Sequence, residues 1–145
     1  MHLEHVNLVV NDMDAMLKFY RAAFPHWRIR DQGDGDWYGK PRKWLHFGDD
    51  YHYLAFNDNG EGTNRELTGH SVGLAHFAYV TNDLTAVIAR LTAAGFAIAK
   101  AGAEEPFRKN VYFIDPAGFE VEFVEYLSDL PAERNLNQAK SKEVL

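Results

Sequence analysis

The 145-residue sequence contains no cysteine. This absence excludes disulfide bonds, thiolate metal ligands, iron–sulfur clusters and cysteine nucleophiles, because each of them needs a thiol. A basic surface is missing as well, since 15 lysines and arginines stand against 21 aspartates and glutamates, a formal net charge of -6. Phosphate backbones and anionic lipids attract basic surfaces, so we expect neither a nucleic acid nor a membrane as a partner.

Long hydrophobic runs are also missing. No apolar stretch approaches the roughly 20 residues of a transmembrane helix. The first residues, Met1-His2-Leu3-Glu4, lack the basic segment and apolar run of a signal peptide, so we expect a cytoplasmic protein.

The length predicts one domain. Aromatic residues form 14% of the chain and histidine occurs seven times, a composition that suits a ligand-sized cleft.

The sequence repeats itself with an offset of 71 residues. Residues 5–24 align with residues 76–95 without a gap, and seven of the twenty aligned pairs are identical, including His5 with His76. Each copy has a short strand, an Asn-Asp pair suited to capping a helix, and then apolar residues at helical spacing. Gly95 favours the end of the second helix. The apolar helical positions are Met13, Met16, Leu17 and Tyr20, and Leu84, Val87, Ile88 and Leu91.

Three strand-like runs follow the helix in each copy, so each copy is predicted as a βαβββ module. A single helix covers only one face of a four-stranded sheet, which leaves the other face to meet a partner. We therefore predict an α+β fold in which two βαβββ modules form one domain around a central cleft. The predicted strands after the helices are 27–30, 44–48 and 51–57, and 96–100, 110–114 and 119–126. The predicted segments are a first module at 1–57, a linker at 58–73, a second module at 74–126, and a C-terminal tail at 127–145, which is either a frayed end or an arm onto a second subunit.

Strand alternation predicts which side chains enter the cleft. His5 and His76 occupy equivalent positions of the repeat, so both are expected on the side away from the helix. In the last strand Glu120 and Glu122 take the same side, and at least one of them should meet a cation or water, because a buried unpaired carboxylate is costly. Two imidazoles and a carboxylate form a ligand set that suits Fe, Mn, Ni or Zn.

The segments HVNLVVND at 5–12 and DPAGFEVE at 115–122, with the repeated strand that begins at His76, resemble the vicinal oxygen chelate superfamily. This superfamily contains glyoxalase I, type I extradiol dioxygenases, methylmalonyl-CoA epimerase, and the fosfomycin and bleomycin resistance proteins. The resemblance covers residues 1 to about 126. It implies that His5, His76 and Glu122 bind a divalent metal ion, and that the protein forms a homodimer.

One position differs from the family pattern. Bacterial glyoxalase I usually has a glutamate in the last strand of the first module, where it serves as ligand and proton carrier, and the run 51–57 contains none. We expect Tyr53 to occupy that position, with His52 facing the helix unless a bulge turns it inward. The sequence therefore leaves open whether Tyr53 or His52 provides a fourth protein ligand.

Another feature resembles the extradiol dioxygenases. Tyr112 lies ten residues before Glu122, like the extradiol tyrosine that hydrogen-bonds a ligand oxygen. His46 occupies the equivalent position of the first module, and a histidine near a metal can exchange protons around neutral pH. We therefore expect His46 and Tyr112 to be catalytic. The auxiliary histidine of the extradiol enzymes is missing, because residues 101–110 contain no histidine.

Two loops are expected near the mouth of the cleft, at 31–43 and 101–109. They combine glycine, aromatic and basic residues, among them Trp37, Arg42 and Arg108, and an arginine can bind a carboxylate through two hydrogen bonds. We expect Tyr53, Trp37 and Arg108 to contact the substrate. The first loop is either a lid or a solvated connector.

The function that these features favour is a divalent-metal-dependent enzyme of glyoxalase or dioxygenase type. It would act as a lyase, isomerase or dioxygenase on a small substrate through two vicinal oxygens. A first alternative is an extradiol-type Fe(II) ring-cleaving dioxygenase. A second is a non-catalytic, ligand-sequestering protein similar to the bleomycin resistance proteins, in which an aromatic groove replaces the metal site.

Overall fold

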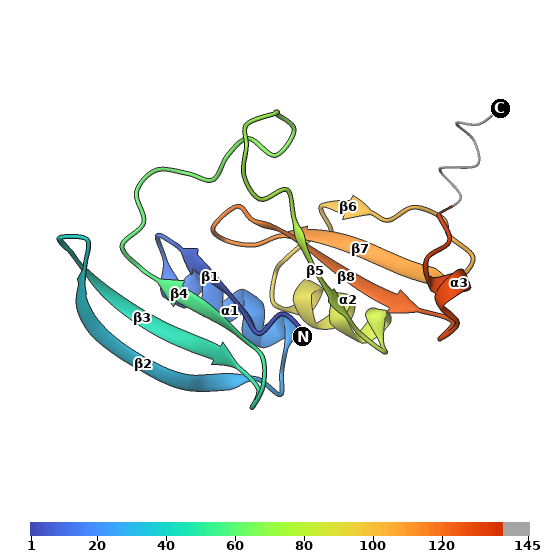
Figure 1. Cartoon of the computed structure of the whole chain (residues 1–145), viewed down its shortest axis with the longest axis horizontal. Helices are drawn as coiled ribbons and strands as arrows, with labels where there is room; N and C mark the ends of the chain where they lie inside the picture. Colours follow the sequence, from blue (N-terminus) through green and yellow to red (C-terminus); the bar gives the residue numbers. More distant parts are fainter. Residues whose placement is uncertain (138–145) are drawn as a thin grey trace. The chain divides into compact units, whose positions relative to one another are not determined.

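The computed structural model describes residues 1–137; the predicted tail from 138 to 145 lies outside the described residues. The chain divides into two compact units. Unit 1 comprises Met1–Arg65 and Asp115–Gly118, and unit 2 comprises Glu66–Ile114 and Phe119–Leu145. Each unit has a four-stranded mixed sheet with one long helix, so the predicted α+β fold with two βαβββ modules is confirmed (Figure 1).

Unit 1 has the strand order β1-β4-β3-β2, with β1 parallel to β4 and the other neighbours antiparallel. Helix α1 begins after Asp12, whose side chain accepts a 2.9 Å hydrogen bond from the backbone N–H of Ala15, as the Asn-Asp pair predicts. The buried ring of Tyr20 on α1 lies 5.6 Å from the ring of Phe56 on the sheet. The elements are β1 (His5–Val9), α1 (Met13–Ala23), β2 (Arg28–Trp37), β3 (Lys40–Gly48) and β4 (Tyr53–Asn57).

Unit 2 repeats this arrangement with the order β5-β8-β7-β6. Asp83 caps α2 by accepting a 2.9 Å hydrogen bond from the backbone N–H of Ala86. Gly95 follows the helix at a φ of 94°, a left-handed conformation that favours glycine, which agrees with the predicted helix end. The elements are β5 (Phe77–Val80), α2 (Leu84–Ala93), β6 (Lys100–Ala101), β7 (Arg108–Ile114), β8 (Glu120–Tyr126) and α3 (Pro131–Arg134).

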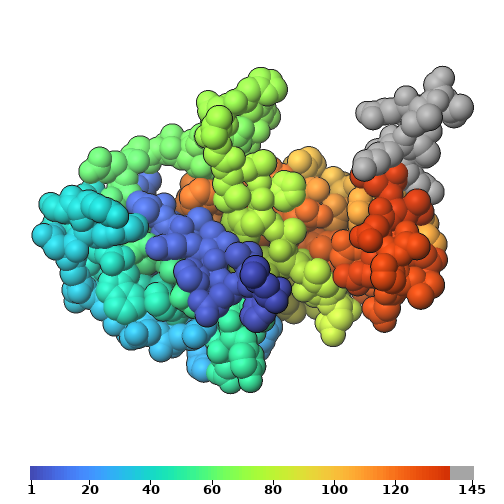
Figure 2. Space-filling view, in the orientation of Figure 1, coloured from blue at the N-terminus to red at the C-terminus, as the bar shows by residue number. Residues whose placement is uncertain are grey.

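The expected loop at 31–43 is wrong, because this segment forms a β-hairpin between β2 and β3. Tyr38 and Gly39 join the strands with φ angles of 51° and 79°, as a two-residue type I′ turn requires. The hairpin was missed because residues 31–36 are polar or glycine and show no apolar alternation. The exposed end of the hairpin is visible in cyan in Figure 2. The segment is therefore part of the sheet of unit 1 and not a loop.

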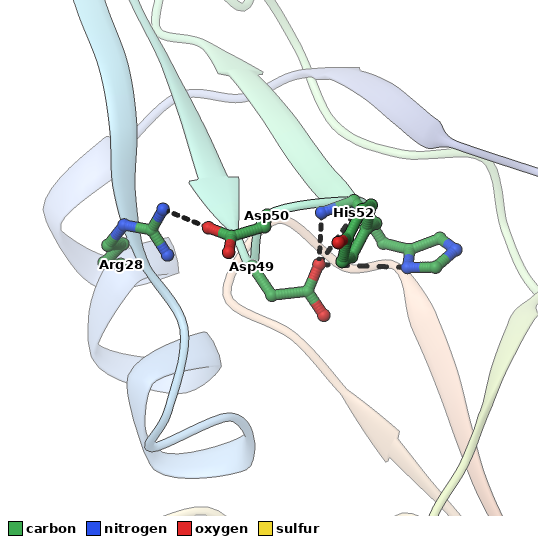
Figure 3. A network of polar contacts seen from close by, with 5 residues as sticks. Arg28, Asp49, Asp50 and His52 are labelled. Atoms are coloured by element: carbon green, nitrogen blue, oxygen red, sulfur yellow. Dashed lines mark hydrogen bonds and ion pairs between the residues drawn. The ribbon is translucent and has the colours of Figure 1, made fainter.

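The turn between β3 and β4 also differs from the prediction. Tyr51 and His52 precede β4, and their backbone N–H groups donate to the Asp49 carboxylate at 2.8 and 2.7 Å (Figure 3). Arg28 forms an ion pair with the neighbouring Asp50, in which a guanidinium nitrogen lies 2.5 Å from a carboxylate oxygen. The expectation that His52 lies on a strand facing the helix is wrong, since its half-exposed side chain belongs to this turn.

In unit 2 the predicted strand at 96–100 is replaced by the shorter strand β6, which contains only Lys100 and Ala101. The segment from 71 to 76 lies exposed at the surface, as Figure 2 shows in light green. Within the described part of the chain, no helix is long and apolar enough to cross a membrane.

Candidate metal centre

Each sheet has one face packed on its helix and one face turned away from it, here called the open face. On β1 the side chains of Val6 and Leu8 are more buried than those of His5 and Asn7, so the two polar residues lie on the open face. On β8 the alternation buries Val121 and Phe123 and places Glu120 and Glu122 on the other side. The predicted strand parity is therefore confirmed for both modules.

His76 and Glu122 meet on the open face of unit 2. The His76 Nε2 atom lies 3.2 Å from the Glu122 Oε2 atom. His76 directly precedes β5, and the parallel register pairs Ala78 with Glu122, which brings the imidazole beside the carboxylate. The other carboxylate oxygen, Oε1, accepts a 2.9 Å hydrogen bond from the Asn110 side-chain amide. Glu122 therefore turns one oxygen to the imidazole while Asn110 holds the other.

This spacing fits two ligands of one metal ion. Nitrogen and oxygen ligands bind ions such as Zn at about 2.1 Å, so adjacent donor atoms of one coordination sphere lie about 3.0–3.4 Å apart. The imidazole–carboxylate pair also has the donor chemistry that Fe, Mn, Ni and Zn accept. The separation of His76 and Glu122, two of the three predicted ligands, is therefore compatible with one metal ion.

Tyr112 lies beside this pair on β7, directly opposite Glu122 in the strand register. Its ring meets the His76 ring edge-on at 5.4 Å, and the Asn110 amide lies 3.3 Å from its hydroxyl. Burial, and next the Glu122 charge, raise the pKa of the Tyr112 hydroxyl above its usual range. The hydroxyl therefore stays protonated at neutral pH and can donate a hydrogen bond.

Lys100 is a further polar residue beside this pair, in contact with Glu120 and Tyr112. Its Nζ atom lies 2.9 Å from Glu120 and 4.2 Å from the centroid of the Tyr112 ring. The hydrogen bond to Glu120 raises the pKa of Lys100, so the ammonium is charged. The expectation that one of the two glutamates meets a cation is confirmed by the Glu120–Lys100 contact.

His5 lies on the open face of unit 1, at the end of a row of four rings called the ring row: Trp44, His46, Tyr53 and His5. Neighbouring ring centroids along the row lie 5.1, 4.5 and 4.5 Å apart, and His5 stacks on Tyr53 with an interplanar angle of 12°. The Nδ1 atom of His5 lies 2.9 Å from the Glu4 carboxylate. Arg30 also contacts the ring row, since its guanidinium carbon lies 4.5 Å from the centroid of the Tyr53 ring.

The predicted catalytic residue His46 lies within the ring row, between Trp44 and Tyr53. Burial lowers the pKa of His46, and Asp31 partly opposes this effect. The imidazole is therefore mostly neutral at pH 7 and able to accept a proton. Burial likewise raises the pKa of the neighbouring Tyr53 hydroxyl.

The strand register identifies a different residue at the position of the missing glutamate. β1 pairs Asn7 with Ala55, whereas β5 pairs Ala78, the repeat equivalent of Asn7, with Glu122. Ala55 is therefore the counterpart of Glu122, and the expectation that Tyr53 fills this position is wrong. A methyl group offers no ligand atom.

The remaining predicted substrate residues, Trp37 and Arg108, stand at strand ends. Trp37 ends β2 and stacks with Arg42, whose guanidinium carbon lies 4.6 Å from its ring, while Arg42 donates to the Asn57 side chain. Arg108 begins β7, lies 3.7 Å from the Glu105 carboxylate, and lines a cavity of about 540 Å³.

The three predicted ligands do not all belong to the same unit, since His5 belongs to unit 1 and His76 and Glu122 belong to unit 2. Among residues 1–137, no three His, Cys, Asp or Glu side chains form a cluster that could hold a metal ion. Sequence reasoning missed Asn110, Lys100 and Glu4. Strand alternation from Tyr112 was a signal for Asn110, and adjacency to His5 was a signal for Glu4.

Residues 2–123 match the Glyoxalase/Bleomycin resistance protein/Dioxygenase superfamily. This chain belongs to that superfamily. No curated protein sequence matches it. Solved structures of superfamily proteins nevertheless share its fold at low sequence identity.

A glyoxylase/bleomycin resistance protein/dioxygenase domain from Frankia sp. EAN1pec is 23% identical, with 87% of this chain and 98% of that one covered and a TM-score of 0.70. A glyoxalase family protein from Enterococcus faecalis is 20% identical, with 86% and 97% covered and a TM-score of 0.67. A variant of the fosfomycin resistance protein FosX from Listeria monocytogenes, complexed with Mn(II) and 1S,2S-dihydroxypropylphosphonic acid, is 16% identical, with 92% and 98% covered and a TM-score of 0.68.

Proposed function

We propose that this superfamily member is a divalent-metal-dependent enzyme of glyoxalase or dioxygenase type that acts on a small substrate through two vicinal oxygens. His5, His76 and Glu122 are its proposed metal ligands. The observation that carries the proposal is the 3.2 Å approach of the His76 imidazole to the Glu122 carboxylate, whose second oxygen is held by Asn110. A carboxylate held in this way keeps one oxygen available for a cation.

The proposed metal ion is Fe, Mn, Ni or Zn, since imidazole and carboxylate ligands suit all four. When bound, such an ion acts as a Lewis acid that stabilises negative charge on substrate oxygens. The FosX structure supports this class of chemistry, because its bound diol carries neighbouring oxygens in the presence of Mn(II).

The chain's own groups supply proton transfer and orientation in this proposal. His46 is mostly neutral at pH 7 because burial lowers its pKa, so it accepts a proton from the substrate. Tyr112 keeps its proton because burial raises its pKa, so it donates a hydrogen bond to a substrate oxygen. Tyr53, Trp37 and Arg108 are proposed to contact the rest of the substrate.

The test begins with metal analysis of protein purified without chelator. Chelator-treated protein is then titrated with Mn(II), Fe(II), Ni(II) and Zn(II), for the wild type and for His5→Ala, His76→Ala and Glu122→Gln. We expect micromolar or tighter binding in the wild type and a loss of at least about 100-fold in each variant, since removal of one ligand also leaves the others misdirected. The matched control is His70→Ala, which removes an exposed linker histidine.

A metal-free wild type that binds none of the four ions at micromolar concentration would refute the proposed function. The metal-loaded protein is next assayed for two reactions, isomerisation of a hemithioacetal and uptake of O₂ with catechols after anaerobic loading of Fe(II). O₂ uptake with ring cleavage would identify the extradiol alternative, which is favoured by the position of Tyr112 directly opposite Glu122.

A non-catalytic, ligand-sequestering function is the second candidate, and the ring row supports it. Trp44, His46 and Tyr53 form a continuous aromatic surface on one sheet face, which suits flat ligands. In this case a chelator and His5→Ala would abolish metal binding yet leave ligand binding unchanged. If the ligand is lost together with the metal, the enzyme proposal stands and sequestration does not.

The homodimer and the cytoplasmic location remain predictions. Sedimentation of the purified protein with and without the metal tests the first, and subcellular fractionation tests the second.

A further inference from the structure

The two histidines of the repeat have different neighbours, although their strands are equivalent. The Nδ1 atom of His5 lies 2.9 Å from the Glu4 carboxylate. The residue before His76 is Ala75, which has no polar side-chain atom. The Nε2 atom of His76 instead faces Glu122 across the sheet. The repeat therefore preserves the histidine but not its partner.

Glu4 is fixed in place by more than the contact with His5. Its backbone carbonyl accepts a 3.2 Å hydrogen bond from the backbone N–H of Tyr53, which anchors the residue directly before β1 and beside β4. Tyr53 also stacks on the His5 ring, 4.5 Å away. The carboxylate and the stacked ring thus act on the same imidazole from two directions.

The side of the imidazole that Glu4 occupies has a chemical consequence. A neutral imidazole carries one N–H and one lone pair, and a carboxylate at Nδ1 favours the tautomer with the proton on Nδ1. The Nε2 lone pair is then free to bind a metal ion. Such carboxylate–histidine pairs orient the ring and raise its basicity as a ligand.

We propose that Glu4 is a positioning residue that fixes the Nδ1–H tautomer of His5, so that His5 presents Nε2 as its metal-binding atom. The metal-binding part of this inference rests on the proposed function, whereas the tautomer is a property of the metal-free protein. In unit 2 the carboxylate at the histidine is Glu122. The equivalent strand position of unit 1 is Ala55, and there Glu4 places a carboxylate at His5.

The experiment compares the wild type with Glu4→Ala and Glu4→Gln. The first variant removes the acceptor, and the second keeps an oxygen acceptor without the charge. Glu61→Ala is the control, because Glu61 is another exposed carboxylate of unit 1, paired with Lys40 at 2.9 Å. His76, preceded by Ala75, serves as an internal reference in every spectrum.

Long-range ¹H–¹⁵N spectra of ¹⁵N-histidine-labelled, metal-free protein at pH 8 report the tautomer of each ring. We expect His5 in the Nδ1–H form in the wild type and in Glu61→Ala, a shift toward a mixture in Glu4→Ala, and an intermediate state in Glu4→Gln. Metal titrations of the same proteins should show affinity lowered by about 10–100-fold in Glu4→Ala and less in Glu4→Gln.

A wild-type His5 in the Nε2–H form would overturn the proposal, and so would a Glu4→Ala variant with unchanged tautomer and unchanged metal affinity. A wild type that binds no metal but shows the Nδ1–H form of His5 would support the role of Glu4 and refute the proposed function instead. Unfolding midpoints of all variants should agree closely, because an exposed ion pair contributes little to stability.

Discussion

The hydroxyl of Tyr20 donates a 2.7 Å hydrogen bond to the carboxylate of Asp115, although 95 residues separate them. Both residues are buried, with exposed fractions of 0% and 3%. Asp115 begins the turn between β7 and β8, and this turn, Asp115–Gly118, belongs to unit 1. A segment that lies in the second module of the sequence is thus held by a side chain of α1.

Removal of this hydroxyl should destabilise the protein. We expect Tyr20→Phe to lower the free energy of unfolding by about 1.5–3 kcal/mol, because the buried carboxylate loses a donor that water cannot replace. Urea titration monitored by circular dichroism measures the change. Tyr51→Phe, at a residue 75% exposed in the β3–β4 turn, is the control and should change stability little. Equal effects of the two substitutions would contradict this account.

Gly48 is predicted to be intolerant of any side chain. A Cβ atom at this position would lie 2.0 Å from the backbone oxygen of His52, so the backbone must move to admit it. We expect Gly48→Ala to cost about 1–3 kcal/mol or more of unfolding free energy, measured by urea titration. Gly35→Ala on β2 is the matched control, since nothing lies within 4 Å of the place that a Cβ atom would take there, and it should be neutral or slightly stabilising. A Gly48→Ala protein as stable as the control would contradict the prediction.

Tyr38 adopts a left-handed conformation that a bulky side chain rarely adopts. The ring is 93% exposed, so its removal sacrifices little packing. A type I′ turn prefers Asn followed by Gly, and Gly39 already occupies the second position. We expect Tyr38→Asn to raise the free energy of unfolding by about 0.5–1 kcal/mol in the same urea titration. A decrease would show that the tyrosine side chain contributes contacts that its exposure does not indicate.

Stability should depend on pH through His46. Burial lowers the pKa of this residue in the folded state, so the unfolded chain binds the proton more tightly. The free energy of unfolding therefore falls as the pH drops below about 6.5, the ordinary pKa of histidine, and is recovered above it. His46→Gln should flatten this dependence between about pH 5 and 7. An NMR titration of the His46 ring proton with a midpoint at or above about 6.5 would contradict the prediction.

Much of the fold could be predicted because its signals are local. The repeat with His5 and His76 identified the two modules, and the Asp12 and Asp83 caps marked where their helices begin. Alternation along β8 placed Glu122 away from the helix, because successive side chains of any strand point to opposite faces. These features depend on residues within one strand or one helical turn.

Other features were decided by strand pairing. The β2–β3 hairpin formed from residues without apolar alternation, because its backbone hydrogen bonds and its turn at Tyr38 and Gly39 do not need a hydrophobic pattern. The register of β1 on β4 made Ala55, and not Tyr53, the counterpart of Glu122. A register is set by two strands together, so neither strand reveals it alone.

The two modules, their helices, and the faces on which His5, His76 and Glu122 lie were therefore predictable from local patterns in the sequence. The partners of His76 and Glu122 depended on the tertiary structure, which placed Glu122 at His76 and Asn110 at Glu122. It also brought the Asp115 turn to Tyr20. The physical reason is that periodicity fixes the direction of a side chain, whereas its contacts depend on strand register and packing between segments that are distant in the sequence.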